Sequence, residues 1–182
     1  MPALSKSVKR TSAYSFGGVP LVYAWPTFTP EGLNSATYTY ATDGSVATII
    51  FDDNITPFLL EAEVETVAYS DNVQIGANRF PKHTVAMKFA GRSDGLNAVM
   101  AAFDLGRTTF CLQSATGKIV LVGGQNGLIA EKSESGAGAT STDFAGYDVV
   151  LSGAETKRIP TVDADAFAGL RVDANTTSPV TG

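Results

Sequence analysis

The side chains best suited to chemistry are scarce in this sequence. The chain has one histidine, His83, and one cysteine, Cys111. A histidine can act as a general base, and a cysteine can act as a nucleophile where a base and a positive environment activate its thiol. His83 falls on an apolar strand face and Cys111 lies between two apolar residues. We therefore expect a hydrogen-bonded structural histidine and a buried, inert cysteine.

Several carboxylates lie close enough in sequence to be considered as an acid–base pair: Asp52, Asp53, Glu61, Glu63 and Glu65. A glycoside hydrolase needs two carboxyl groups roughly 5 to 9 Å apart. Any two side chains separated by two positions on a strand meet that distance, so the spacing favours a solvated face over a catalytic pair. A calcium site from residues 52–54 lacks the regular ligand spacing of a calcium-binding loop.

Three glycines, Gly123, Gly124 and Gly127, follow an apolar run without forming a phosphate-binding loop. The Gly-Lys-Ser/Thr ending is missing, and no helix is predicted to begin there. Turn formation accounts for these glycines. The sequence thus predicts no enzyme, no cofactor and no metal site.

Strands with alternating side chains are predicted to carry most of these residues. Residues 37–41 and 46–51 flank Asp43-Gly44, a dipeptide that favours a hairpin turn. Residues 80–90 are predicted to bury His83 together with the other apolar residues on its face. Residues 59–69 are predicted to form a strand with an acidic face, made by Glu61, Glu63 and Glu65.

One helix is predicted over residues 94–105, where apolar residues recur at the spacing of a single helix face. Ser93 is expected to cap its start, and Gly106 is expected to end it in a left-handed conformation. Further strands are predicted at 108–113, 119–123, 127–131 and 147–152. About eight strands and one helix indicate a mainly β fold, an antiparallel β-sandwich or β-barrel with a flanking α-helix.

The gap from about residue 132 to residue 145 is too long for an ordinary hairpin turn. It is polar and rich in small residues, so we expect a long hairpin arm that becomes ordered against a partner. The candidate contact residues of this arm are Ser133, Gly136, Gly138 and Thr140.

The composition indicates one domain over residues 1–182, with a flexible N-terminal arm at 1–12 and a flexible tail at 175–182. A short ordered stretch at most is expected beyond Pro160. The only basic cluster is Lys6, Lys9 and Arg10. It is predicted to be a solubilising arm, with binding to an acidic partner surface as the alternative.

The net charge of −5 argues against a nucleic-acid-binding surface, because such a surface needs clustered basic residues. Charged residues make up 17% of the chain, below the ~25% typical of soluble domains, so we expect copies of the chain to cover part of its surface. No apolar run is long enough to predict a signal peptide or a membrane span.

The order of these elements resembles that of tail tube proteins from long-tailed bacteriophages, especially phages of Bacteroidetes hosts. Four segments carry the resemblance, which covers roughly residues 50–163: NRFPKHTVAMKF, GLNAVMAAFDLGRT, TGKIVLVGGQNGL, and FAGYDVVLSGAE followed by a proline. The resemblance implies a virion protein, made in the bacterial host cytoplasm, that closes into rings, usually hexameric. The rings would stack into the tube through which DNA is ejected.

In such proteins sheets from neighbouring subunits line the lumen, and a long hairpin and terminal arms reach the next ring. The resemblance therefore assigns the arm to ring stacking and Glu61, Glu63 and Glu65 to an acidic lumen that lets double-stranded DNA slide without specific binding. It implies further copies, the tape measure protein and the tail terminator as partners, and no membrane.

Three alternatives remain open from the sequence. Tail terminator, baseplate hub and head-completion proteins share the fold. A carbohydrate-binding or adhesin module would present aromatic side chains for stacking, with Trp25, Tyr38, Tyr40 and Tyr69 as candidates. An acid–base hydrolase would use two of the strand carboxylates.

Overall fold

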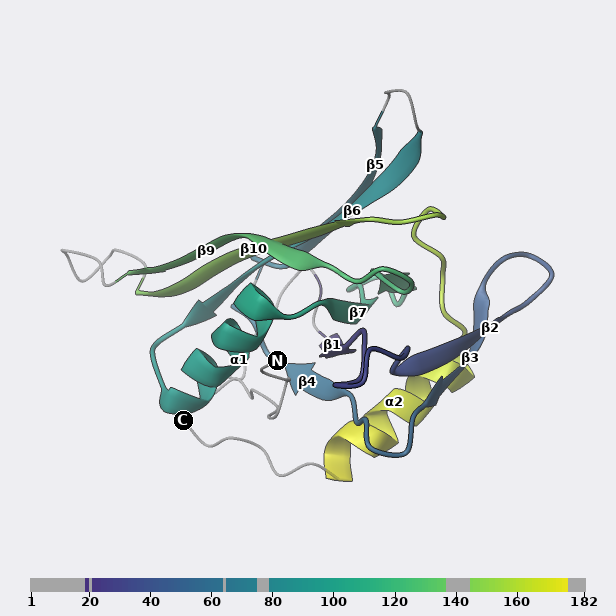
Figure 1. Ribbon diagram of the computed structural model, residues 1–182, viewed down its shortest axis with the longest axis horizontal. Helices are drawn as coiled ribbons and strands as arrows, with labels where there is room; N and C mark the ends of the chain where they lie inside the picture. The colour runs from purple at the N-terminus through teal and green to yellow at the C-terminus, as the bar shows by residue number, and fades with distance from the viewer. Residues whose placement is uncertain (1–18, 20, 64, 75–78, 137–144, 177–182) are drawn as a thin grey trace.

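The computed structural model describes residues 19, 21–63, 65–74, 79–136 and 145–176. The fold is mainly β and its strand pairs within the sheets are antiparallel, as predicted. Two four-stranded sheets lie face to face as two layers, with helices at the side and below (Figure 1). The arrangement is an open sandwich, and the predicted alternative of a closed barrel is not observed among the described strands.

The first sheet has the strand order β4-β1-β7-β8. Its strands are β4 (Phe58–Leu60), β1 (Leu21–Pro26), β7 (Thr108–Gln113) and β8 (Ile119–Val122). Residues 160–162 pair with β8, since the Leu121 N–H donates to the Pro160 carbonyl at 3.1 Å. The same segment contacts β3 (Val46–Phe51), which pairs with β2 (Ala36–Tyr40) in a small hairpin. This hairpin was predicted.

The second sheet has the strand order β5-β6-β10-β9. Its strands are β5 (Ala68–Gln74), β6 (Phe80–Ala90), β10 (Gly146–Ala154) and β9 (Ile129–Gly136). The predicted alternation of β6 is confirmed, because His83, Val85, Met87 and Phe89 are buried while the residues between them are only half-buried.

The main core fills the space between the two sheets and α1 (Asp94–Leu105). Val99 and Phe103 of α1 pack there with Phe110 of the first sheet and Met87 of the second. The predicted helix bounds and the Ser93 cap are confirmed, since the Leu96 N–H donates to the Ser93 hydroxyl at 3.1 Å. Gly106 differs from the prediction: its φ of −111° is extended rather than left-handed, because the chain runs straight on into β7.

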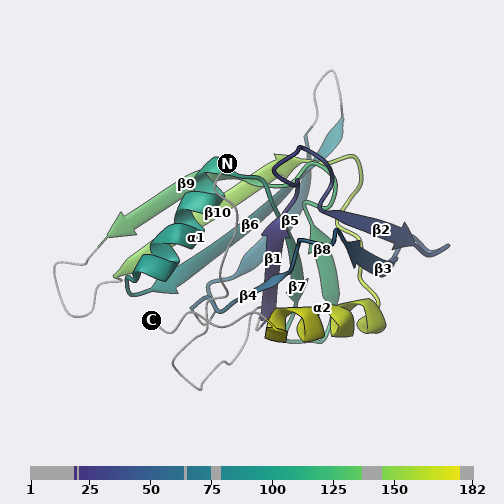
Figure 2. The same ribbon diagram turned by 60° about the horizontal axis from the view of Figure 1, so that its bottom comes forward.

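A second helix, α2 (Ala164–Thr176), was not predicted. It packs beneath the first sheet (Figure 2), where Phe167 meets Tyr23 edge to face at a centroid distance of 5.3 Å. Phe167 and Leu170 are almost fully buried there. The sequence of α2 is rich in Ala and Asp, so its narrow apolar stripe gives only a weak periodic signal. The first sheet is consequently buried on both faces, whereas the second is buried on one.

Candidate functional site

Among the described residues, no helix or strand covers the outer face of the second sheet (Figure 1). The centre of this face carries short side chains at positions that pair across the strands: Ala68, Ser70, Thr84, Ala86, Val150 and Ser152, of which Ser152 is buried. Charged residues lie at the hairpin end of the face. Lys132 Nζ lies 2.9 Å from Asp148 Oδ2 and 3.1 Å from Glu134 Oε2, and Lys88 Nζ lies 3.8 Å from Asp148 Oδ2. The hydrogen bond to Asp148 raises the pKa of Lys132.

The predicted arm begins later than expected. Ser133 and Gly136 lie within β9, where they pair with Val149 and Gly146 of β10. The remaining arm candidates, Gly138 and Thr140, lie outside the described residues. The polar sequence of β9 gives no apolar alternation because both faces of its outer half meet solvent. β9 is a strand because it pairs with β10, and not because its polar residues favour the strand conformation.

The β9–β10 hairpin extends the second sheet past the core (Figure 1). Every residue of β9 from Ser133 onward is exposed. Within the described part of the chain β9 pairs with β10 alone, so β9 is the edge strand of the sheet. The other edge is β5, which pairs only with β6 there.

The predicted acidic strand face is wrong. β4 ends at Leu60 and β5 begins at Ala68, and the described residues between them belong to no strand. Glu65 has a φ of 60°, and the Glu63 N–H donates to the Lys88 carbonyl at 2.7 Å. Glu61 and Glu63 are half-buried and Glu65 is exposed, so the three carboxylates do not form one extended stripe. Their alternation was a coincidence of spacing.

His83 and Cys111 are both buried, as predicted. His83 Nδ1 accepts a hydrogen bond from the Gly123 N–H at 3.3 Å, and Nε2 lies 2.9 Å from the Lys157 carbonyl oxygen. Burial lowers the pKa of His83. Burial also raises the pKa of the Cys111 thiol, so this side chain is not an activated nucleophile.

The glycine loop at residues 123–127 is held by a buried carboxylate that the sequence did not identify. Glu155 accepts hydrogen bonds from the backbone N–H groups of Gln125 at 3.3 Å and Asn126 at 3.0 Å. Burial raises the pKa of Glu155. A single Glu after an apolar strand carries no signal of this role, because its partners lie about thirty residues earlier in the chain.

The aromatic residues considered for glycan stacking do not form a shared exposed surface. Trp25 is fully buried. Tyr38 and Tyr69 pack against the two core clusters, and burial raises the pKa of Tyr38. The Lys157 ammonium lies 4.3 Å from the centroid of the Tyr40 ring. The structure therefore offers no aromatic platform from these four residues.

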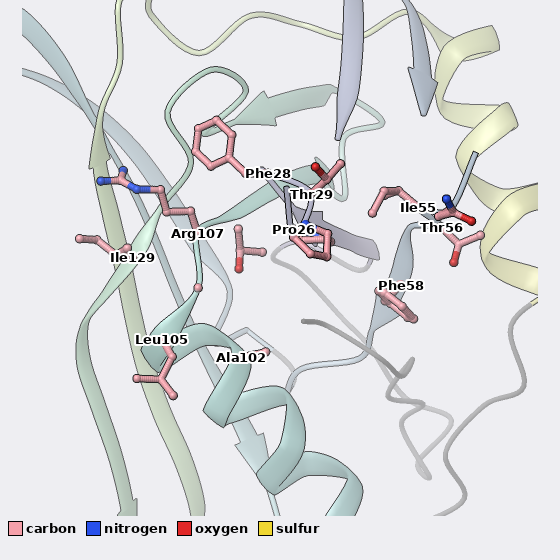
Figure 3. A pocket seen from close by; sticks show the side chains of 14 residues that line it. Pro26, Phe28, Thr29, Ile55, Thr56, Phe58, Ala102, Leu105, Arg107 and Ile129 are labelled. Atoms are coloured by element: carbon pink, nitrogen blue, oxygen red, sulfur yellow. The ribbon is translucent and has the colours of Figure 1, made fainter. Parts of the chain in front are cut away.

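An apolar pocket opens where β1 and α1 end (Figure 3). Its volume is about 450 Å³. Phe58 and Ala102 of its lining are buried, whereas Leu105 and Ile129 are exposed. Arg107 also lines it, and the guanidinium of Arg107 donates to the Asn126 carbonyl oxygen at 2.9 Å. No sequence pattern indicated this pocket, because its lining comes from four separate segments.

Among the described residues, no three His, Cys, Asp or Glu side chains are grouped closely enough to hold a metal ion. None of the helices there has the length and apolar character needed to span a membrane. Comparison of the chain with protein-family models, with curated proteins and with solved structures found no match.

Proposed function

We propose that this protein is a structural subunit that assembles with copies of itself into stacked rings, as in the tail tube of a long-tailed bacteriophage. The observation that carries the proposal is the second sheet, with an uncovered outer face and a hairpin that extends past the core. An antiparallel sheet can leave one face in water, but the protruding hairpin and the long edge strands of this sheet offer a neighbouring subunit a surface on which to pair.

The edges of the two sheets support this assignment. In the first sheet, residues 160–162 cover β8 and the opposite edge strand, β4, has only three residues. In the second sheet the edge strands are long, seven residues in β5 and eight in β9. Unpaired backbone N–H and C=O groups on long edge strands are templates for further strand pairing.

The charges near the end of the β9–β10 hairpin favour contact with one specific partner over edge-to-edge pairing with any exposed strand. Lys132, Glu134 and Asp148 present both signs of charge within one small area. A partner must match that pattern, because like charges brought together disfavour a wrong register. In a tube built in this way, double-stranded DNA would pass through the lumen without specific binding. The tape measure and tail terminator proteins would be further partners, and the mature location would be the virion tail.

The hairpin provides the test. Replacing residues 137–145 with an Asn-Gly turn joins the strands directly beyond the Gly136–Gly146 pair. Because shortening a loop changes its closure entropy by only about 1 kcal/mol, the monomer should keep its unfolding midpoint in urea. Sedimentation velocity should show assembly of the wild type and its loss in the shortened variant.

A matched control keeps the β9–β10 hairpin intact and changes the β2–β3 hairpin instead. Asp43→Asn alters the β2–β3 turn, where Asp43 Oδ1 accepts from the Ser45 N–H at 2.9 Å. This variant should assemble as the wild type does. Equal assembly of all three proteins would remove the hairpin from the proposal. Single rings that never stack would favour the terminator, hub or head-completion alternatives.

A further inference from the structure

The apolar pocket shown in Figure 3 adjoins a second cavity, which has a volume of about 660 Å³. Phe28, Arg107 and Ile129 line both cavities, so the two spaces share one wall. The other residues that line the second cavity come mainly from β6, β9 and β10, so this cavity lies beside the second sheet. A ligand that crosses the shared wall is in contact with both cavities at once.

The apolar cavity is suited to a single alkyl chain. Apart from Arg107, its described lining carries no charged residue. Its volume of about 450 Å³ lies within the range of roughly 300 to 1,000 Å³ seen for ligand pockets. A methylene group is similar in size to a water molecule, which takes up ~30 Å³, so the cavity holds a chain of at most about fifteen carbon atoms. Each chain of a bilayer lipid spans half of a hydrocarbon core about 30 Å thick, so two such chains together exceed this volume.

The second cavity carries the charged residues, since Lys82, Glu131 and Arg107 line it. Lys82 Nζ and Glu131 Oε1 form an ion pair, so their charges offset each other. Arg107 forms no ion pair in the part of the chain that the structure describes. The wall between the two cavities therefore carries one cation that is available to an anionic group.

The Arg107 side chain is positioned at the boundary of the apolar cavity. Figure 3 shows its guanidinium on the side of Ile129, away from Pro26 and Ile55. Its Nη1 donates to the Asn126 carbonyl oxygen at 2.9 Å, which holds the side chain without neutralising its charge. A guanidinium has five N–H donors, so this bond leaves others for a carboxylate, which a guanidinium can bind through two parallel hydrogen bonds.

Two acidic residues near Arg107 leave this cation available. Glu155 is buried, and its carboxylate accepts hydrogen bonds from the backbone N–H groups of Gln125 and Asn126. Asp104, three residues before Arg107, is exposed and lines neither cavity. The charge of the combined lining is therefore that of Arg107, and it favours an anionic ligand over a cationic one.

We propose that the two cavities form a binding site for a single-chain anionic amphiphile, such as a medium-chain fatty acid. The alkyl chain fills the apolar cavity, and the carboxylate accepts hydrogen bonds from Arg107 at the shared wall. Burial of the chain supplies most of the affinity, about fourfold for each methylene group, and the charged hydrogen bonds fix the direction in which the ligand lies. This binding function goes beyond the proposed assembly and requires only one copy of the chain.

Isothermal titration calorimetry of the full-length protein with decanoate, below the concentration at which decanoate forms micelles, tests this site. We expect saturable binding of one decanoate per chain. Octanoate, which has two methylene groups fewer, should bind about fifteenfold more weakly. Decyltrimethylammonium has a similar chain and the opposite charge, and it should bind at least about tenfold more weakly than decanoate. Equal affinities for the anionic and the cationic ligand, or no saturable binding of decanoate, would overturn the proposal.

Two arginine variants locate the carboxylate of the ligand. Arg107→Gln should weaken decanoate binding about tenfold and leave the binding of decan-1-ol unchanged, because only the first ligand carries a charge. Arg107→Lys keeps the charge and should retain most of the decanoate affinity. The matched control is Arg92→Gln, which removes an exposed guanidinium that donates to the Ser135 hydroxyl at 3.1 Å and lines neither cavity. Equal weakening of decanoate and decan-1-ol by Arg107→Gln would show a structural role for Arg107 and overturn the assignment of the head group.

Vesicle flotation separates a free amphiphile from a lipid held in a bilayer. Vesicles of phosphatidylglycerol, which is anionic and has two chains, should carry no more protein to the top of a density gradient than vesicles of phosphatidylcholine do. Flotation of the wild type with phosphatidylglycerol, abolished by Arg107→Gln, would overturn the assignment to a single-chain ligand. Binding is counted per chain in these measurements, so their outcome is independent of whether electron microscopy shows rings or tubes.

Discussion

Two glycine-bearing segments look alike in the sequence and behave oppositely in the fold. Residues 123–127 form a loop whose backbone N–H groups are held by His83 and Glu155. Gly136 ends β9 at the exposed end of the hairpin, and a Cβ added there would meet no atom within 4 Å. Glycine therefore permits close packing in the first segment, whereas the second is left open to solvent.

The two segments also differ in what they join. The glycine loop follows β8 of the first sheet. Its backbone is hydrogen-bonded to His83 of β6 and to Glu155, the residue after β10, in the second sheet. The hairpin end is anchored only through the β9–β10 ladder among the described residues. Stability should therefore depend on the loop, and assembly should depend on the hairpin.

The largest expected effect on stability is that of Gly153→Ala. A Cβ at Gly153 would overlap the carbonyl oxygen of Gly127, which is backbone and cannot rotate away. We expect the free energy of unfolding to fall by about 3 kcal/mol, as for other overpacked sites. Gly136→Ala is the control and should change it by less than about 0.5 kcal/mol. Equal losses in urea unfolding would abolish the distinction between the two segments.

A smaller effect is expected from the pH dependence of the loop. The folded pKa of His83 lies below its usual value, so folding favours the neutral ring. The stability from His83 is therefore present above pH ~6.5 and is lost as the pH falls through the folded pKa. Asp71 faces this ring and favours its charged form, and Arg158 pairs with Asp71 at 3.1 Å.

His83→Gln isolates this contribution, because Glu155 opposes it. Because the folded pKa of Glu155 is raised, the contribution of Glu155 to folding stability is lost as the pH rises above about 4.5. Acidification therefore increases the contribution of Glu155 while it decreases that of His83. The difference in unfolding free energy between wild type and His83→Gln should decrease below pH ~6.5. A difference that is constant from pH 5 to pH 8 would contradict the buried, neutral assignment of His83.

The smallest effect on stability is expected at the hairpin. Lys132→Gln removes exposed ion pairs with Asp148 and Glu134, and solvent screening leaves such pairs little effect on stability. The unfolding free energy should hardly change, but the concentration at which assembly begins should increase. Sedimentation velocity measures that concentration. A large loss of stability without a change in assembly would reverse the roles assigned to the two segments.

The sequence predicted those parts of the fold in which local pattern and tertiary packing agree. The alternation of β6, the apolar stripe of α1 and the Asp43-Gly44 turn each specify their element locally. It failed at β9, where pairing with β10 organises a polar segment, and at α2, where burial of Phe167 and Leu170 compensates for a weak stripe. The role of Glu155 and the apolar pocket arise from contacts distant in sequence, so no local pattern encodes them.

At the acidic residues the sequence predicted a strand that the structure does not have. Glu61, Glu63 and Glu65 have the period of a strand, but Glu65 adopts a left-handed turn and the chain changes direction. Spacing alone cannot show whether the backbone is extended through an alternating run. An acidic lumen made by these three residues remains a prediction.

Electron microscopy of the purified full-length protein, over a series of concentrations, tests the central claim most directly. The proposed function predicts rings of constant diameter that stack into tubes as the concentration increases. A protein that remains a monodisperse monomer at the highest concentration reached would contradict it.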